Sequence, residues 1–150
     1  MQIASRVADV RMLVDSLMHR PIVSAEAATS AREAARTMER SRVGCLVVTR
    51  GDDAVGIVTE RDLVFRVLAA GRDADATRLA DVMSAPIATV TPATSVDEAA
   101  ALMKQLKVKR LVVLREGEAV GVISVTDIAY ASPEVSRAML AAWVKQRWEG

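Results

Sequence analysis

The sequence predicts an α+β fold built from two copies of one strand–helix–strand–strand–helix unit, flanked by N- and C-terminal helices. Shifting the sequence by 65 residues aligns 17–63 with 82–128 without a gap, and 19 of the 47 pairs are identical. Each copy holds one segment with the apolar period of a helix and two apolar runs short enough for strands. A glycine-containing turn separates the two runs, as in a hairpin. A repeat at a fixed period indicates one supersecondary unit used twice.

Each predicted unit begins with a short extended segment that follows a Met-x-x-Pro element. These segments are 22–24 and 87–90. The helices that follow should bury one face each, formed by Ala31, Ala34, Ala35 and Met38 in 31–41 and by Val96, Ala99, Ala100, Met103 and Leu106 in 96–106. The hairpin strands are predicted at 45–49 and 54–58, and at 111–115 and 119–123. A final helix should begin near Glu60 in the first copy and near Thr126 in the second.

Polar and glycine-containing segments set the expected domain boundaries. The first repeat is predicted at 11–70 and the second at 78–131. The segment 71–77 starts with Gly71 and is polar, which is typical of a helix stop and linker. The remaining residues, 132–150, have apolar positions at helical spacing and are predicted to form a C-terminal helix.

The composition excludes several classes of function. A net charge of +1 and 3% aromatic residues argue against a nucleic-acid binder. No apolar run approaches the roughly 18 residues of a membrane helix, so no membrane partner is expected. The single cysteine, Cys45, fits a reduced cytoplasmic setting and is expected to be a buried, unreactive thiol. No nucleophile–base pair, metal-ligand cluster or phosphate-binding glycine loop is visible, so neither catalysis, a metal nor a required cofactor is predicted.

A hydroxyl residue followed three positions later by aspartate ends the hairpin in both copies. These pairs are Thr59 with Asp62 and Ser124 with Asp127. One interpretation is a helix cap, in which the hydroxyl accepts from a free backbone N–H and the aspartate suits the helix dipole. The other is a nucleotide site, because a helix N-terminus suits phosphate and a carboxylate one turn in can accept two hydrogen bonds from a ribose diol. The two interpretations are compatible.

The repeated motifs resemble the CBS domain. Val-Gly-Cys-Leu-Val-Val precedes Gly-Ile-Val-Thr-Glu-Arg-Asp in the first copy, and Val-Lys-Arg-Leu-Val-Val precedes Gly-Val-Ile-Ser-Val-Thr-Asp in the second. Two tandem copies over about 11–130 look like a CBS pair, or Bateman module. The resemblance implies two repeats packed sheet to sheet with pseudo-twofold symmetry and two clefts that bind AMP, ADP or ATP. It also implies a disc-shaped homodimer and an effector protein that the sequence does not name.

The resemblance assigns to each cleft the hydroxyl and aspartate of one copy and the first strands of the other. The first cleft would combine Thr59 and Asp62 with Ser84, Thr89, Val108, Lys109 and Arg110. The second would combine Ser124 and Asp127 with His19, Ser24, Val43, Gly44 and Cys45. The aspartates would bind ribose, and the hydroxyls would contact ribose or phosphate. The phosphates would gather Lys109, Arg110 and Arg61.

The two expected clefts are unequal in charge. Gly44 and Cys45 stand where the second copy has Lys109 and Arg110. Hydrogen bonds to charged groups are worth about 1.5–3 kcal/mol each, so the first cleft should bind nucleotide tenfold or more tightly. Lys109 and Arg110 could equally be an ordinary solvated strand edge. The alternatives for the whole chain are a dimerisation or interaction module with degenerate clefts, or a sensor of S-adenosylmethionine or NAD derivatives.

Overall fold

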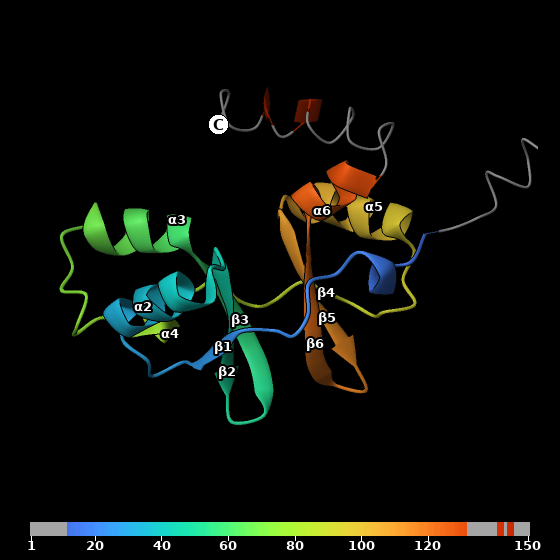
Figure 1. The fold of residues 1–150 in the computed structure, drawn as a ribbon. Coiled ribbons are helices and arrows are strands. Elements are labelled where there is room, and N and C mark those ends of the chain that lie inside the picture. The colour runs from blue at the N-terminus through green and yellow to red at the C-terminus, as the bar shows by residue number, and fades with distance from the viewer. Residues whose placement is uncertain (1–11, 132–140, 143, 146–150) are drawn as a thin grey trace, which may run out of the picture. The chain divides into compact units, whose positions relative to one another are not determined.

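The computed structural model describes residues 12–131, 141, 142, 144 and 145, which form two compact units. The first-repeat unit comprises 21–87 and 116–119. The second-repeat unit comprises 12–20, 88–115 and the described residues from 120 onward. Each repeat has a three-stranded sheet and helices, which confirms the predicted α+β class (Figure 1). The expected N-terminal helix and most of the expected C-terminal helix lie outside the described residues, although 141, 142, 144 and 145 are helical.

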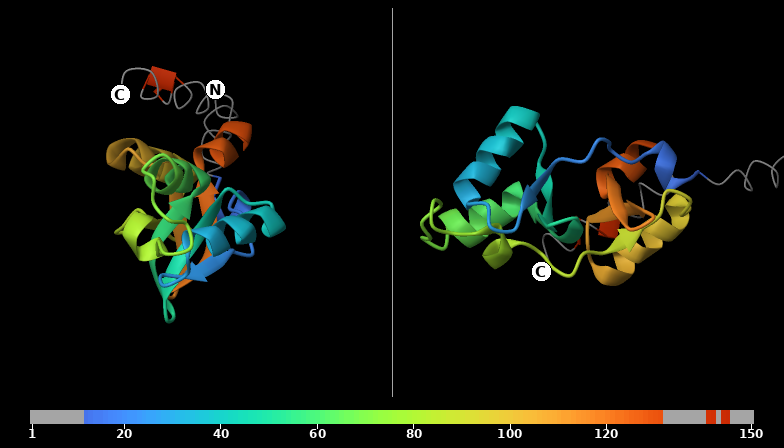
Figure 2. Two further views of the ribbon diagram at one scale, coloured as in Figure 1. Left: turned by 90° about the vertical axis from the view of Figure 1, so that its left-hand side faces the viewer. Right: turned by 90° about the horizontal axis from the view of Figure 1, so that it is seen from below.

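The first-repeat unit has the predicted order of strands and helices, followed by a short helix that the sequence did not predict. The elements are β1 (Ser24–Glu26), α2 (Ala31–Ser41), β2 (Cys45–Arg50), β3 (Asp53–Thr59), α3 (Glu60–Leu63), the π-helical η2 (Val64–Leu68) and α4 (Leu79–Val82). The sheet order is β1-β2-β3, with β1 parallel and β3 antiparallel to β2. The α2 and α3 helices lie beside each other (Figure 2).

The second-repeat unit reproduces this arrangement. Its elements are the 3-10 turn η1 (Val14–Ser16), β4 (Thr89–Val90), α5 (Val96–Leu106), β5 (Arg110–Arg115), β6 (Glu118–Ser124) and α6 (Val125–Ala131). The sheet order is β4-β5-β6, with β4 parallel to β5. The hairpin turn between β5 and β6 has positive φ angles at Glu116 (51°) and Gly117 (83°), which is the conformation that glycine favours.

The two long helices begin and end at the residues that the sequence predicts. The hydroxyl oxygen of Ser30 accepts from the backbone N–H of Glu33 at 3.2 Å, and that of Ser95 accepts from Glu98 at 3.1 Å. Both helices end in a left-handed residue, Arg42 in α2 and Lys107 in α5. The serine caps are signals of local sequence, whereas Arg42 and Lys107 are not residue types that usually mark a left-handed stop.

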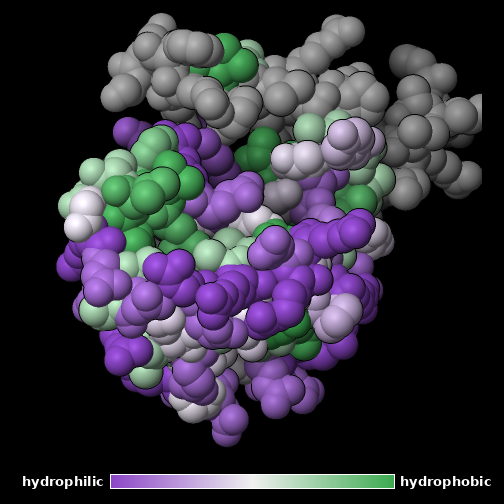
Figure 3. Space-filling model, turned by 60° about the vertical axis from the view of Figure 1, so that its left-hand side comes forward, coloured by the Kyte–Doolittle hydropathy of each residue, from purple (hydrophilic) through white to green (hydrophobic). Residues whose placement is uncertain are grey.

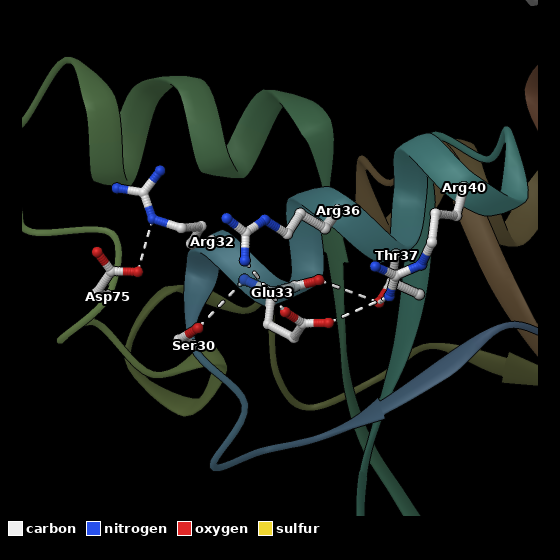
Figure 4. A network of polar contacts seen from close by, with 7 residues as sticks. All are labelled: Ser30, Arg32, Glu33, Arg36, Thr37, Arg40 and Asp75. Atoms are coloured by element: carbon white, nitrogen blue, oxygen red, sulfur yellow. Dashed lines mark hydrogen bonds and ion pairs between the residues drawn. The ribbon is translucent and has the colours of Figure 1, made fainter.

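The outer face of α2 carries a network of polar side chains (Figure 4). Glu33 lies at its centre, with Arg40 3.1 Å and Arg36 3.8 Å from its carboxylate oxygens. At the start of the helix, Arg32 donates to Asp75 at 2.6 Å, and this hydrogen bond and the charge of Asp75 raise the pKa of Arg32. These groups are exposed, so we assign the network to the solvated face of the helix rather than to the core.

Each unit has one apolar core under its helices. The two cores consist of Ala27, Ala31, Ala34, Met38, Leu46, Val48, Val58, Val67, Leu79 and Val82 in the first-repeat unit, and Val14, Met18, Val90, Val96, Ala99, Met103, Leu111, Val113, Ile123 and Ile128 in the second. Two inward predictions are wrong, because Ala35 is exposed and Leu106 is 47% exposed. Both lie at the edge of their helix's apolar stripe.

The leading strands begin two residues later than predicted, so that β1 is shifted along the chain and β4 is shorter. β1 begins at Ser24 rather than Ile22, and β4 begins at Thr89 rather than Ile87. Parallel pairing with the next strand fixes these limits, since Ser24 is the first residue of β1 in register with β2 and Thr89 is the first of β4 in register with β5. Within the described residues, no helix combines the length and apolar character needed to cross a membrane.

Candidate functional site

A short segment pairs with the last strand of each sheet through an antiparallel bridge and positions the candidate site. In the second-repeat unit, His19 and Val122 exchange two backbone hydrogen bonds, of 2.8 and 3.2 Å. In the first-repeat unit, Ser84 and Ile57 exchange two, of 2.9 and 3.1 Å. His19 and Ser84 are 65 residues apart, so they are equivalent positions of the repeat. The segment that leads into the first repeat therefore belongs to the second-repeat unit.

The hydroxyl and aspartate of the second-repeat unit form a closed turn between β6 and α6. Asp127 Oδ2 accepts from the backbone N–H of Ser124 at 2.7 Å and from its hydroxyl at 2.9 Å. In return, the Ser124 hydroxyl oxygen accepts from the Asp127 backbone N–H at 3.2 Å. The second carboxylate oxygen, Oδ1, lies 2.5 Å from His19 Nε2. Asp127 thus uses both oxygens within its own unit.

The first-repeat unit has the same turn between β3 and α3, with a different partner. Asp62 Oδ2 accepts from the Thr59 backbone N–H at 2.8 Å, and the Thr59 hydroxyl accepts from the Asp62 backbone N–H at 3.1 Å. Asp62 Oδ1 faces Arg66 Nη1 at 3.8 Å, beyond hydrogen-bond distance. The capping interpretation is therefore confirmed at Thr59–Asp62, and it leaves one carboxylate oxygen for another donor.

Sequence reasoning missed Arg66. Its guanidinium donates to the Val82 carbonyl at 2.8 Å and to the Met83 carbonyl at 3.3 Å, which holds it beside Asp62. The available signal was its spacing, because Arg66 follows Asp62 by four residues and this spacing brings side chains together on a helix.

The other predicted site residues divide between the units. The second-repeat unit holds His19, Thr89, Val108, Lys109 and Arg110 with Ser124 and Asp127. The first-repeat unit holds Ser24, Val43, Gly44, Cys45, Arg61 and Ser84 with Thr59 and Asp62. Each expected cleft draws residues from both units, so its assembly stays a prediction. Within a unit, the structure brings His19 to Asp127 and places Ser84 beside Ile57, two residues before Thr59.

The expected phosphate-binding cations have structural contacts of their own. Lys109 and Arg110 are half-buried where β5 begins, and the Lys109 carbonyl accepts from the Val125 backbone N–H at 2.9 Å. Arg61 lies over the ring of Phe65, with its guanidinium carbon 5.0 Å from the ring centroid. A cation held over an aromatic face is stabilised there, so Arg61 has a structural role besides the expected one.

Two expected ligand contacts of the first-repeat unit line a shallow groove of about 620 Å³ beside α2 and α3. Val43 and Gly44 form part of its wall, together with Ala35, Met38, Glu39, Arg42, Glu60, Leu63 and Val64. Its charged lining residues are Glu39, Glu60 and Arg42. Cys45 is half-buried, which corrects the expectation of a buried thiol. Among the described residues, no three His, Cys, Asp or Glu side chains are grouped so as to hold a metal ion.

Comparison with known proteins identifies the repeats. The model of the CBS domain matches residues 14–69 and 79–134. The uncharacterized protein MK0525 of Methanopyrus kandleri is 32% identical over 122 residues, which are 80% of this chain and 62% of that protein. The uncharacterized protein MJ0450 of Methanocaldococcus jannaschii is 28% identical over 79% of this chain and 65% of its own length. The chain thus spans less than two thirds of these relatives.

Solved structures have the same fold. A protein with CBS domains from Burkholderia ambifaria is 32% identical, with a TM-score of 0.73 over 80% of this chain and 93% of that one. The hexameric CBS-CP12 protein of bloom-forming cyanobacteria is 29% identical, with a TM-score of 0.76 over 82% and 69%. The CBS domain protein PAE2072 of Pyrobaculum aerophilum, solved in complex with AMP, is 29% identical, with a TM-score of 0.73 over 87% and 99%.

Proposed function

The chain belongs to the CBS domain family, and we propose that it is a non-catalytic regulatory module that binds an adenosine nucleotide and signals by a change of conformation or assembly. The observation that carries the proposal is the hydroxyl–aspartate turn, which the fold builds twice with the same capping hydrogen bonds. Each turn fixes Oδ2 of its aspartate, while Oδ1 faces a different side chain, His19 in one turn and Arg66 in the other. A fixed carboxylate is a suitable acceptor for the hydroxyls of a ribose.

The choice of ligand rests on chemistry and on one relative. The AMP complex of the Pyrobaculum protein supports an adenosine nucleotide as the ligand class. Lys109 and Arg110 stand one after the other at the start of β5, where a phosphate would find two cations. The equivalent positions in the first repeat, Gly44 and Cys45, carry no charge. We therefore expect AMP, ADP or ATP to bind unequally at the two turns.

The Thr59–Asp62 turn should belong to the stronger site, with Ser84, Thr89, Val108, Lys109, Arg110 and Arg61 as the further candidate contacts. The Ser124–Asp127 turn should belong to the weaker one, with His19, Ser24, Val43, Gly44 and Cys45. Asp62 Oδ1 lies 3.8 Å from Arg66 Nη1, whereas Asp127 Oδ1 has a close partner in His19. The partners of the two carboxylates and the charges of the two strands both favour stronger nucleotide binding at the Thr59–Asp62 turn.

A panel of ligands tests the proposal. Thermal unfolding is followed with AMP, ADP, ATP, S-adenosylmethionine and NAD at about 1 mM. A ligand with a Kd of about 10 µM stabilises the folded chain by about 2.7 kcal/mol, which raises Tm by several degrees. A shift with S-adenosylmethionine or NAD alone would replace the proposed ligand. No shift with any compound would favour the alternative, a dimerisation or interaction module with degenerate sites.

Calorimetric titration of two variants then locates the sites. Asp62→Ala should weaken nucleotide binding tenfold or more, and Asp127→Ala should weaken it less, because the cations expected to bind phosphate belong with the Asp62 site. Asp52→Ala, in the exposed hairpin turn, is the matched control for loss of one carboxylate. A greater loss from Asp127→Ala than from Asp62→Ala would reverse the assignment.

We also propose that the chain forms a homodimer and acts on a separate effector protein. Equivalent positions of the two repeats carry exposed aromatic side chains, Phe65 at 56% and Tyr130 at 89% exposed. Large exposed apolar groups at repeated positions are typical of an interface between protein molecules. The hexameric CBS-CP12 protein supports self-assembly as a property within the family.

A further inference from the structure

The two capping turns differ in the side chain that lies beside Oδ1 of the aspartate. In the second-repeat unit, His19 Nε2 lies 2.5 Å from Asp127 Oδ1. In the first-repeat unit, the equivalent residue is Ser84, and Asp62 Oδ1 lies 3.8 Å from Arg66 Nη1. Since a carboxylate oxygen only accepts hydrogen bonds, the imidazole donates in the close contact. The two turns therefore share the same capping hydrogen bonds, but Oδ1 of the aspartate has a different neighbour in each.

The position of His19 is fixed by its backbone rather than by burial of its side chain. Two backbone hydrogen bonds to Val122 hold the residue across β6. A Cβ on Gly121 would lie 2.8 Å from the His19 carbonyl oxygen, so the close crossing depends on a glycine. The imidazole is 77% exposed, while the Asp127 side chain is 11% exposed. The imidazole can rotate into solvent without disturbing the core, whereas the carboxylate stays in place.

We propose that His19 is a latch, whose imidazole competes with a ribose hydroxyl for Asp127 Oδ1 and so lowers the affinity of this turn for ribose. The inference rests on the proposed function, because it assumes that the aspartate receives a ribose diol, and it replaces the ligand contact that the proposed function gives to His19. Asp127 Oδ2 is committed to two hydrogen bonds from Ser124, so Oδ1 is the oxygen that a ligand must use. A ribose hydroxyl binds there only after the imidazole leaves, and the lost hydrogen bond reduces affinity roughly two- to tenfold.

The effect of the latch on binding is separate from the effect of the different charges of the two strands. Lys109 and Arg110 would act on the phosphates of a ligand, whereas His19 acts on the oxygen that meets its sugar. The effect of His19 should therefore depend on the ribose diol and be independent of the number of phosphates. His19 is a positioning residue in this scheme, since it acts through Asp127.

Calorimetric titration with AMP in the Asp62→Ala background isolates the Asp127 turn. His19→Ser places the residue of the other repeat at this position, and it should tighten AMP binding roughly two- to tenfold. His19→Gln keeps an N–H donor of similar reach. This variant should therefore bind AMP nearly as weakly as the chain with His19. Arg20→Ala is the matched control, because Arg20 is the adjacent exposed side chain and its hydrogen bonds go to Asp15. It should leave AMP binding unchanged.

A second probe separates the latch from a general structural effect. The gain from His19→Ser should disappear with 2′,3′-dideoxy-AMP, which has no diol to compete for Oδ1. If the wild-type chain binds AMP but His19→Ser binds it no more tightly in the Asp62→Ala background, the latch is wrong and the proposed function stands. An equal gain with the dideoxy analogue also overturns the latch. If neither the wild-type chain nor any variant binds AMP, ADP or ATP, both proposals fall together.

Discussion

At the scale of single residues, close packing explains why a glycine stands at the same position of both hairpins, Gly56 and Gly121. A Cβ on Gly121 would lie 2.8 Å from the His19 carbonyl oxygen and 2.9 Å from the Met18 sulfur. A Cβ on Gly56 would lie 2.5 Å from the Met83 sulfur and 3.0 Å from the Ser84 carbonyl oxygen. The methionine of each Met-x-x-Pro element thus packs over the glycine of a hairpin strand. The Met-x-x-Pro element and the hairpin glycine therefore recur together because they contact each other.

We predict that Gly121→Ala lowers the free energy of unfolding by about 1–3 kcal/mol, because the added methyl group overpacks against a backbone oxygen that cannot rotate away. Chemical denaturation measures the loss. Gly44→Ala is the control, since its Cβ would meet only the flexible Glu60 carboxylate at 3.1 Å and should cost much less. Equal losses in the two variants would show that the crossing at Gly121 tolerates a side chain.

At the scale of elements, each unit takes part of its core from the segment that precedes the other unit's repeat. Val14 in η1 is fully buried in the second-repeat unit, and the equivalent residue Leu79 in α4 is fully buried in the first-repeat unit. The backbone supports this placement, because Val14 donates to the Thr94 carbonyl and Leu79 donates to the Thr29 carbonyl. A truncated repeat would therefore lack a buried side chain of its core.

Substitution of Val14 should destabilise the second-repeat unit, and substitution of Leu79 should destabilise the first-repeat unit. Leu79→Ala should cost about 2–5 kcal/mol and Val14→Ala about 1–3 kcal/mol, because each leaves a cavity in a packed core. Native-state hydrogen exchange should show lost protection first in β4–β6 for Val14→Ala and first in β1–β3 for Leu79→Ala. Loss of protection in β1–β3 from Val14→Ala would contradict the assignment of this segment to the second-repeat unit.

At the scale of the whole molecule, the exposed apolar residues at the ends of the repeats bear on assembly. On the face drawn in Figure 3, apolar side chains gather in one patch that hydrophilic ones border. In η2, Val64 is 47% exposed and Leu68 is 76% exposed, beside Phe65. Tyr130 gives the second repeat an aromatic residue at the position of Phe65. Such groups in water favour burial against another molecule.

We predict that the chain is a dimer in sedimentation equilibrium and that Phe65→Ser and Tyr130→Ser each raise its dissociation constant tenfold or more, as loss of an aromatic interface residue commonly does. Lys104→Ser, an exposed change on α5, is the control and should leave association unchanged. A monomeric wild-type chain would remove the homodimer from the proposal. A dimer insensitive to both aromatic changes would place its interface elsewhere.

The internal repeat and the local signals determined much of the fold. The serine caps and the helical apolar period predicted the bounds of α2 and α5, and the apolar runs on either side of a glycine-containing turn predicted the hairpin strands to within one residue. The spacing of Thr59 and Asp62 was enough to predict a capping turn. These features depend on contacts within a few residues along the chain, so their pattern is visible in a single sequence.

The tertiary structure decided which segments meet. His19 and Asp127 are 108 residues apart, and no local pattern pairs them. The start of β1 at Ser24 follows from its pairing with β2, and the exposure of Ala35 and Leu106 follows from how much of each helix the sheet and its neighbours cover. A sequence period reports the conformation of a segment, whereas its partner is selected by packing over the whole chain. The residues of the turns were therefore predictable, and the latch on one of them was not.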